Sequence, residues 1–401
     1  MKRLLLSITV SLLGLTFGLI GCGGNNGGGT NPPPPVHSFS FHLAETLSAG
    51  NLHPKQIVAA DFNGDGKPDL AVSLFDTSTV AVFLGNGDGT FQPPVHTTLP
   101  IPDWLGILAV GDFNEDGKQD LIVSTIDNGN QENILLLGNG DGTFSQQSPL
   151  PNSCGSLTTV VVDLNGDHHK DLVLGCNGGI QVYLGHGDGT FSGPTNLPIV
   201  SFPGTYFGVA VADFNGDGKL DITAVDTGSQ STPSGSLDFY AGNGDGSFRA
   251  PVATPLPVNT PLFLSYADFH QDGKLDLLVG YANEAILYNG NGDGTFQITS
   301  PTVIYSSPVP NPQNAISVLA ADFLGNHSFG VVTVDFSSGN VQTALNSALG
   351  KSPPDPAIFQ LALAAGTAGL ASADFNRDGV LDDAVFNYNT GDITIILSSV
   401  Q

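Results

Sequence analysis

The sequence predicts an all-β fold, a seven-bladed β-propeller with four-stranded antiparallel blades and a ring closed by an N-terminal strand. Three observations support this fold. An acidic motif begins at Asp61 and recurs at intervals of 51, 51, 50, 55, 54 and 52 residues, a Gly-rich turn recurs between its copies, and short apolar runs separate the two. A fixed period near 50 residues indicates one supersecondary unit used repeatedly. Four short strands per unit is the arrangement of a propeller blade.

The acidic motif has the residue types and the spacing of a calcium loop. In the first copy, Asp61, Asn63 and Asp65 occupy positions 1, 3 and 5, and Asp69 occupies position 9. The backbone carbonyl of Lys67 at position 7 can join them, and Asp69 can bind with both carboxylate oxygens. Such an all-oxygen set of six or seven ligands suits Ca²⁺ better than Zn²⁺ or Cu²⁺. Metal-free Asx turns are the alternative interpretation, and five copies of one spacing disfavour it.

The loop opens like an EF-hand but is expected at the tip of a β-hairpin. An EF-hand needs Glu at position 12 and a helix on either side, whereas position 12 here is Val72. The flanking runs 56–60 and 70–74 are short and apolar, which is typical of two antiparallel strands. Each unit is therefore predicted as strand, acidic loop, strand, loop, strand, Gly-rich turn and strand.

The seven acidic loops are not equivalent. Five carry the full ligand set, although the third has His168 where the other four have Gly, so we expect slight strain in its turn. The fifth loop has His270 at position 3, and imidazole is a poor Ca²⁺ ligand, so weaker binding is expected there. The sixth, from Asp322, lacks oxygen at two of its four side-chain positions and is expected to bind no metal. Beyond the first loop, the predicted ligands, including the carbonyl donors at position 7, are Asp112, Asn114, Asp116, Lys118, Asp120, Asp163, Asn165, Asp167, His169, Asp171, Asp213, Asn215, Asp217, Lys219, Asp221, Asp268, Asp272, Lys274, Asp276, Asp374, Asn376, Asp378, Val380 and Asp382.

The Gly-rich turn, Asn86-Gly87-Asp88-Gly89 in the first unit, has the chemistry of a tight hairpin because its residues tolerate positive φ. A second ion site is the alternative interpretation. Phe91, which follows the turn, is expected to pack between blades. Because strands 1–2 and 3–4 of a meander turn at the same end, the acidic loops and the Gly-rich turns should share one face. The loops between strands 2 and 3, and between blades, should then lie on the opposite face.

The two ends of the repeat region predict how the ring closes. Only two strands, at 384–388 and 393–397, follow the last acidic loop, whereas a spare strand at 38–45 precedes the first. The spare strand matches the outer strands of the other units. We therefore expect it to complete the seventh blade, which leaves no open blade edge.

Residues 1–21 have the features of an export signal, with the charged Met1-Lys2-Arg3 followed by an apolar run from Leu4 to Ile20. The sequence around Cys22 resembles the bacterial lipobox, in which that cysteine is acylated as the signal is removed. A transmembrane anchor is the alternative, but a run of 17 residues that includes Gly and Ser is short for a span. Residues 22–36 then form a lipidated, flexible Gly/Asn/Pro tether, and 37–401 form one propeller domain. We expect an exported lipoprotein of the cell envelope, at the outer membrane or the cell surface.

With Cys22 lipidated, Cys154 and Cys176 remain. They flank the third acidic hairpin, so pairing of its two strands would bring them together. An exported location permits oxidation, and a disulfide is expected.

Composition and motifs narrow the function. The formal net charge of −26, with 33 Asp against four Glu, lacks the basic footprint of a nucleic-acid-binding protein. The excess of Asp over Glu indicates loop geometry and coordination. The sequence contains no G-x-S-x-G, H-E-x-x-H or phosphate-binding loop, and its nine His form no recognisable catalytic set. We therefore expect a protein that is not an enzyme.

The D-F-N-G-D-G-K-x-D-L loops, as at 61–70, resemble the FG-GAP/VCBS repeats, bacterial relatives of the integrin α-subunit N-terminal domain. The resemblance covers most of the chain after the tether, although only Phe207-Gly208 keeps part of the Phe-Gly signature. It implies a seven-bladed propeller with Ca²⁺ loops between strands 1 and 2. Family members include adhesion modules, carbohydrate-binding modules and parts of polysaccharide lyases, so the resemblance does not identify the ligand.

The opposite face holds the candidate ligand-binding residues, which are Asp103, Trp104, Tyr206 and Phe207. Exposed aromatic side chains can stack on sugars or anchor a protein interface, although the same residues could simply fill gaps between blades. We expect a monomeric, calcium-binding surface module that binds a glycan or a protein. The alternatives are a polysaccharide-active, lyase-like enzyme and a scaffold in an envelope assembly.

Overall fold

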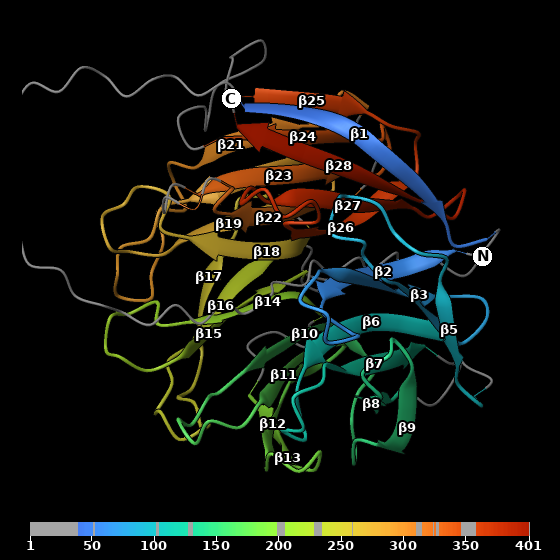
Figure 1. The fold of residues 1–401 in the computed structure, drawn as a ribbon. Coiled ribbons are helices and arrows are strands. Elements are labelled where there is room, and N and C mark those ends of the chain that lie inside the picture. The colour runs from blue at the N-terminus through green and yellow to red at the C-terminus, as the bar shows by residue number, and fades with distance from the viewer. Residues whose placement is uncertain are drawn as a thin grey trace, which may run out of the picture.

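The computed structural model describes residues 39–50, 53–101, 104–126, 131–198, 205–227, 235–258, 260–309, 315–323, 325, 329–345 and 358–400. The described residues form 28 strands and no helix, arranged as seven four-stranded sheets around a central axis (Figure 1). The seven-bladed propeller predicted from the repeat period is therefore confirmed. No helix long and apolar enough to cross a membrane occurs in this part of the chain. The predicted signal, Cys22 and the tether lie outside the described residues.

Each blade is an antiparallel meander, numbered here from the first acidic loop. Blades 1 to 4 consist of β2 (Pro54–Ala60), β3 (Asp69–Leu74), β4 (Thr79–Phe83) and β5 (Val95–Thr98); β6 (Trp104–Gly111), β7 (Asp120–Ile126), β8 (Asn133–Gly138) and β9 (Phe144–Pro149); β10 (Ser156–Val162), β11 (Asp171–Cys176), β12 (Gly179–Gly185) and β13 (Phe191–Leu197); and β14 (Tyr206–Ala212), β15 (Asp221–Asp226), β16 (Ser236–Tyr240) and β17 (Val252–Pro255).

Blades 5 and 6 follow the same order, and blade 7 takes its outer strand from the other end of the repeat region. Their strands are β18 (Pro261–Ala267), β19 (Asp276–Tyr281), β20 (Glu284–Tyr288) and β21 (Thr302–Ser306); β22 (Ile316–Ala321), β23 (Gly330–Asp335), β24 (Asn340–Ala344) and β25 (Ile358–Ala362); and β26 (Thr367–Ala373), β27 (Asp382–Asn387), β28 (Asp392–Val400) and β1 (Phe39–Ser48).

The strand β1 closes the ring as predicted. It pairs antiparallel with β28 from Phe39 opposite Val400 to Ser48 opposite Asp392, with one register shift after Leu43. The two strands lie side by side at the top of Figure 1, blue against red. This pairing gives blade 7 its fourth strand and ties the two ends of the repeat region together without a covalent bond.

Burial follows strand position within a blade. Both faces of the second strand are covered by neighbouring blades, so β3 and its counterparts β11, β15, β19, β23 and β27 are buried at every residue. Outer strands such as β5 alternate between half-buried and exposed residues. This difference explains why the inner runs are almost uniformly apolar and the outer runs are mixed. The apolar clusters lie between adjacent blades, which makes the core a ring of interfaces.

Blade 6 departs from the others in its inner strand. The strands β2, β6, β10, β14, β18 and β26 each carry a register shift near the end opposite the acidic loop. The strand β22 pairs with β23 without one, from Ile316 opposite Asp335 to Ala321 opposite Gly330. The blade whose acidic loop lacks ligands is thus also the blade with a regular inner strand.

Candidate calcium sites

The first acidic loop is folded around the carboxylate of Asp61. Its Oδ1 accepts hydrogen bonds from the amides of Gly64 (2.7 Å) and Asp65 (3.1 Å), and its Oδ2 accepts one from Gly66 (2.8 Å). The amide of Asp65 also donates to Asn63 Oδ1 at 2.9 Å, and Asp65 Oδ1 accepts from the Lys67 amide at 3.0 Å. These Asx-type bonds bend the loop so that the side chains at positions 1, 3 and 5 belong to one compact turn.

Aspartate at position 9 has a role that spacing alone did not predict. Asp69 is fully buried, its Oδ2 accepts from the Phe62 amide at 2.8 Å, and its Oδ1 accepts from the Gly85 amide at 2.7 Å. Glycine is required at position 85 because an added Cβ would lie 2.1 Å from the Pro68 carbonyl oxygen. The carboxylate thus joins the acidic loop to the end of the third strand, in addition to its predicted place in the metal shell.

The same pair of hydrogen bonds recurs in five further blades. In each, the position-9 carboxylate accepts one hydrogen bond from the amide at loop position 2 and one from an amide near the end of strand 3. The residues are Asp120, Asp171, Asp221, Asp276 and Asp382. Burial raises the pKa of Asp69 to about 6 and that of Asp382 to about 7, and it also raises the pKa of Asp120, Asp171 and Asp221. A cation beside these carboxylates would favour their ionised form.

The donor set of the loop fits a hard cation. Asn63 Oδ1, Asp65 Oδ1 and both carboxylate oxygens of Asp69 each accept one hydrogen bond from a backbone amide. A carboxylate or amide oxygen has a second lone pair, which can bind a cation. Every side-chain donor is oxygen, as Ca²⁺ prefers. Among the described residues, however, no three His, Cys, Asp or Glu side chains are grouped closely enough to hold a metal ion. Calcium therefore stays a prediction, with Asp61, Asn63, Asp65, the Lys67 carbonyl and Asp69 as the ligands expected in the first loop.

Three loops show how the sequence variations are accommodated. His168 adopts φ 72°, in the region that the equivalent glycines occupy, so the strain expected in loop 3 is located at this residue. His270 Nδ1 lies 2.8 Å from Asp276 Oδ2, so the imidazole is engaged with the position-9 carboxylate of its own loop. In loop 6, Phe323 is buried, but Leu324 and Asn326 lie outside the described residues.

Two kinds of basic group partly offset the negative charge of the loops. Lys67 Nζ lies 3.1 Å from Asp65 Oδ2, and Lys118 makes the same bond to Asp116 at 3.2 Å. His169 Nδ1 lies 2.6 Å from Glu115 Oε1 in the preceding loop, and this hydrogen bond raises the pKa of the imidazole. The contact between His169 and Glu115 joins the acidic loops of blades 3 and 2.

The Gly-rich turns lie on the same face as the acidic loops, as predicted. A Cβ at Gly87 would lie 3.0 Å from Cδ of Lys67, which places the turn directly against the loop. Within the turn, Asp88 Oδ1 accepts from the Thr90 amide (3.1 Å) and hydroxyl (2.6 Å). These bonds are those of a hairpin turn, the first of the two interpretations considered for this segment.

The Gly-rich turns also connect neighbouring blades. The amides of Gly89, Gly142, Gly189 and Gly294 donate to position-2 carbonyls of the preceding blade's acidic loop, at 2.9–3.3 Å. Beside these bonds, pairs of aromatic rings meet edge to face, among them Phe91 with Phe375 and Phe62 with Phe144. The prediction that Phe91 packs between blades is therefore confirmed. Acidic loops, turns and phenyl rings thus connect adjacent blades at four junctions of the metal-loop face.

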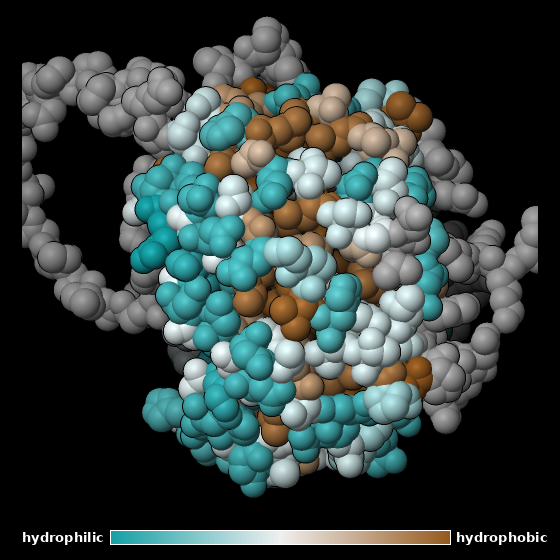
Figure 2. Space-filling model, turned by 45° about the vertical axis from the view of Figure 1, so that its right-hand side comes forward, coloured by the Kyte–Doolittle hydropathy of each residue, from teal (hydrophilic) through white to brown (hydrophobic). Residues whose placement is uncertain are grey.

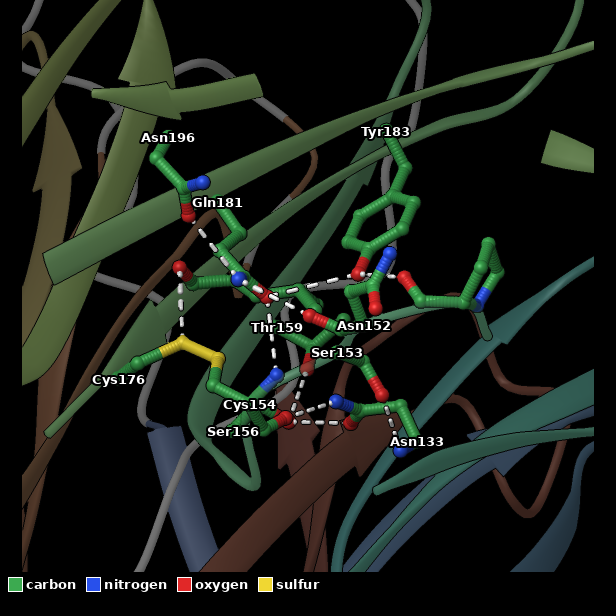
Figure 3. The surroundings of a disulfide bond; sticks show 12 residues. Asn133, Asn152, Ser153, Cys154, Ser156, Thr159, Cys176, Gln181, Tyr183 and Asn196 are labelled. Atoms are coloured by element: carbon green, nitrogen blue, oxygen red, sulfur yellow. Dashed lines mark hydrogen bonds between the residues drawn. A yellow bond between two sulfur atoms is a disulfide. The ribbon is translucent and has the colours of Figure 1, made fainter. Parts of the chain in front are cut away.

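The two cysteines of blade 3 are joined in a disulfide, with Cα atoms 6.1 Å apart (Figure 3). Hydrogen bonds to blade 3 and to blade 2 also hold Cys154, in the segment that leads into β10. The Cys154 amide donates to Gln181 Oε1 at 2.9 Å within the blade, and Asn133 Nδ2 of blade 2 donates to the Cys154 carbonyl at 2.5 Å. The disulfide thus fixes one inter-blade connection on the face opposite the acidic loops.

Of the four candidate ligand-binding residues on that opposite face, only Tyr206 has a described side chain. It is fully buried, and its hydroxyl donates to Asp238 Oδ2 at 2.7 Å. Tyr206 therefore fills the gap between blades 3 and 4 and is not an exposed stacking platform. Asp103 and the side chains of Trp104 and Phe207 lie outside the described residues.

Comparison with known proteins agrees with the repeat geometry. The model of the FG-GAP-like repeat matches residues 61–123, 112–174, 163–224 and 268–328, which together exceed half of the chain. The chain belongs to the FG-GAP-like repeat family.

Two curated relatives of this FG-GAP-like repeat protein are integrins of Drosophila melanogaster. Integrin alpha-PS5 is 28% identical over 167 residues, covering 36% of the chain and 17% of the relative. Integrin alpha-PS3 is 27% identical over 169 residues, covering 36% and 15%. The chain thus matches less than a fifth of the length of these relatives.

A solved structure with the same fold is that of an Agrocybe aegerita lectin, described for its specific recognition of non-reducing terminal N-acetylglucosamine. It superimposes with a TM-score of 0.53 at 19% identity, covering 87% of this chain and 85% of the lectin chain. At this identity the likeness extends to the fold.

Proposed function

We propose that this protein is a non-enzymatic, calcium-stabilised binding module, anchored to the cell envelope through Cys22, that binds a glycan or a protein through the face opposite its acidic loops. The observation that carries the proposal is that the loops of the acidic face repeat from blade to blade, whereas the links on the opposite face differ. On the acidic face, the same loops, turns and aromatic pairs recur, and at four junctions they are hydrogen-bonded from one blade to the next. Loops that repeat and bond to one another stabilise the ring, whereas recognition of a specific ligand requires loops that differ in sequence and length.

The connections on the opposite face do differ. The link between strands 2 and 3 spans only 177–178 in blade 3, but it spans 227–235 in blade 4. Links between blades also vary in length, from 363–366 to 307–315. Surface loops carried on a rigid scaffold are the usual place for binding residues. The likeness to integrin α chains and to a lectin that recognises N-acetylglucosamine supports a binding role.

Calcium has a structural role in this proposal. Bound to the oxygens at positions 1, 3 and 5, it would neutralise carboxylates that otherwise repel one another at the blade tips. We expect calorimetry to show several Ca²⁺ ions bound per chain and EDTA to lower the melting temperature. Native mass spectrometry that finds no retained divalent ion in protein prepared with Ca²⁺ would refute the calcium sites.

Ligand binding is tested with a glycan array and with pull-down from envelope extracts, each performed in Ca²⁺ and in EDTA. The matched variants replace the link 227–235 of blade 4 or, as a control, the short link 177–178 of blade 3. A ligand lost with the blade 4 variant and retained with the blade 3 variant supports the proposal. Binding that survives replacement of every link on this face, or is abolished only by changes in the Gly-rich turns, contradicts it.

The lyase-like enzyme and the envelope scaffold make different predictions. Cleavage of an acidic polysaccharide that is lost in loop variants would favour the enzyme. Co-purification of one envelope protein in a fixed ratio, with no glycan bound, would favour the scaffold.

A further inference from the structure

A cavity of about 270 Å³ lies between blades 6 and 7, in the outer part of the ring. Its walls come from β24 and β25 of blade 6 and from β1, β27 and β28 of blade 7. Six of the nine lining residues are apolar, and the other three are Thr343, Gln360 and Asp383. Phe41 and Phe359 stand edge to face across it, with ring centroids 5.2 Å apart, and Leu361 and Ile396 contribute further apolar surface. Figure 2 shows apolar surface gathered at the top of the molecule, where β1 and β25 lie in Figure 1.

The cavity contains one buried acid, Asp383. The residue is fully buried, and its Oδ1 accepts a hydrogen bond from the Ser372 hydroxyl on the adjacent strand. Its Oδ2 is also buried and has no hydrogen-bond partner among the described residues. A buried carboxylate oxygen left without a donor is destabilising, at roughly 1–3 kcal/mol or more.

Comparison of the seven blades shows that the fold does not require this acid. Asp383 is the residue after position 9 of the acidic loop, and its counterparts in the other blades are all aliphatic and fully buried: Leu70, Leu121, Leu172, Ile222, Leu277 and Val331. The partner across the strand differs too. Ser372 stands where blades 1 and 6 have Ala59 and Ala320.

A hydrophobic site that six blades fill with an alkyl side chain has therefore become a polar pair at the back of a cavity. Burying an acid in place of Leu or Val sacrifices stability, and sites that do so are characteristically functional. Among the described residues that line the cavity there is no Lys, Arg or His to neutralise the carboxylate. A cationic hydrogen-bond donor would satisfy both the charge and the open acceptor of Asp383.

We propose that this cavity is a binding site for a small amine, a molecule with an apolar ring or short alkyl body and one ammonium group that donates to Asp383 Oδ2. The apolar walls and the two phenyl rings receive the body of the ligand, and the carboxylate fixes its orientation. A volume near the lower end of the range for ligand pockets, about 300–1,000 Å³, limits the body to a single ring or a short chain. The site is on the outer rim of the ring, so it is separate from the loop face of the proposed function.

The probe for this site is 2-phenylethylamine, and its neutral counterpart is 2-phenylethanol. Binding is measured on the calcium-loaded propeller by ligand-observed NMR and by calorimetry. We expect saturable binding of the amine, with the alcohol bound at least about tenfold more weakly, since hydrogen bonds to charged groups contribute roughly 10- to 100-fold in affinity.

Three variants separate recognition from structure. Asp383→Asn is nearly isosteric and can keep the bond from Ser372, Asp383→Leu restores the residue type of the other blades, and Asp141→Asn removes one exposed carboxylate elsewhere as a charge-matched control. We expect the first two to weaken amine binding by about tenfold or more and the control to leave it unchanged. We also expect Asp383→Leu to melt at the same temperature as the parent protein or higher.

Several outcomes would overturn the proposal. These are the absence of saturable amine binding by the parent protein, equal binding of the amine by Asp383→Asn, and an equal loss with Asp141→Asn. Unfolding of Asp383→Leu would show that the acid is needed for the fold, which also contradicts the proposal. Failure of this site leaves the loop-face function intact, because the glycan array and the pull-down do not depend on Asp383.

Discussion

Replacing Asp69 by Ala tests whether position 9 is a structural bridge as well as a predicted calcium ligand. The change leaves two buried amides, those of Phe62 and Gly85, without their acceptors at 2.8 and 2.7 Å. A buried donor left unsatisfied costs roughly 1–3 kcal/mol, so two of them give about 2–6 kcal/mol. This is a large part of the net stability of a typical domain, about 5–15 kcal/mol.

The assay is urea denaturation of the parent protein, Asp69→Ala and a control, Asp88→Ala, each in EDTA and in Ca²⁺. Asp88 is exposed and bonds only within its own turn, so its loss should change stability by less than about 1 kcal/mol. If Asp69 bridges the loop to strand 3, its substitution lowers the denaturation midpoint even in EDTA and lowers it further in Ca²⁺. A midpoint unchanged in EDTA would refute the bridge and leave only a metal-binding role.

Deleting residues 37–47 removes most of β1, so the melting temperature should fall sharply, and an unchanged melt would refute closure by this strand. Replacing Cys154 and Cys176 by Ser should cost about 3 kcal/mol for a loop of this length; alkylation and mass spectrometry of the parent protein that found two free thiols would contradict the disulfide. In EDTA, stability should fall as pH rises from about 4 to about 7, because burial raises the folded-state pKa of Asp69 to about 6 and of Asp382 to about 7, above the unfolded value of 3.8. Ca²⁺ should flatten this dependence, and an apo protein that melts higher at pH 8 than at pH 5 would contradict the assignment. Replacing Cys22 by Ser should move the protein from the membrane fraction to the soluble fraction of cells, and an unchanged distribution would refute lipid anchoring.

The fold was predictable because its information is periodic. The recurrence of the acidic loop fixes the number of blades, and the unmatched strand at 38–45 fixes how the ring closes. In the structure that strand runs three residues further, to Ser48, because its backbone continues to find partners along β28 up to Asp392. The disulfide was predictable for a related reason, because Cys154 and Cys176 flank the two paired strands of one hairpin.

The second role of position 9 was not predictable from spacing. The amides that Asp69 accepts belong to Phe62, seven residues away, and to Gly85, on the far side of two strands. Backbone amides carry no signature in the sequence, so only the three-dimensional meander shows where they point. The bonds from Gly-rich turns to neighbouring blades were hidden for the same reason.

Two side chains show opposite limits of inference from residue type. The sequence makes Tyr206 a candidate ligand-binding residue, with filling a gap between blades as the alternative. Its hydroxyl donates to Asp238, 32 residues away, and its ring belongs to the core between blades 3 and 4, as in the second interpretation. For Asp383 the signal was present in the sequence. Aligning the seven repeats sets it against six aliphatic residues, and this contrast needs no structure to be seen.

The unusual blade 6 has a consequence for how the ring responds to a chelator. Its loop has Gly330 where six blades have the bridging aspartate, and Phe323, with 1% of its surface exposed, packs close to that glycine. In blade 6, packing of the Phe323 ring beside Gly330 thus takes the place that the position-9 carboxylate has in the other blades. If the other six blades bind calcium as proposed, withdrawal of divalent ions would loosen those six blades and spare blade 6. Amide hydrogen exchange in EDTA would then show slow exchange in the strands of blade 6 and faster exchange in the other blades. The rest of the ring could re-form on blade 6 when the ions return.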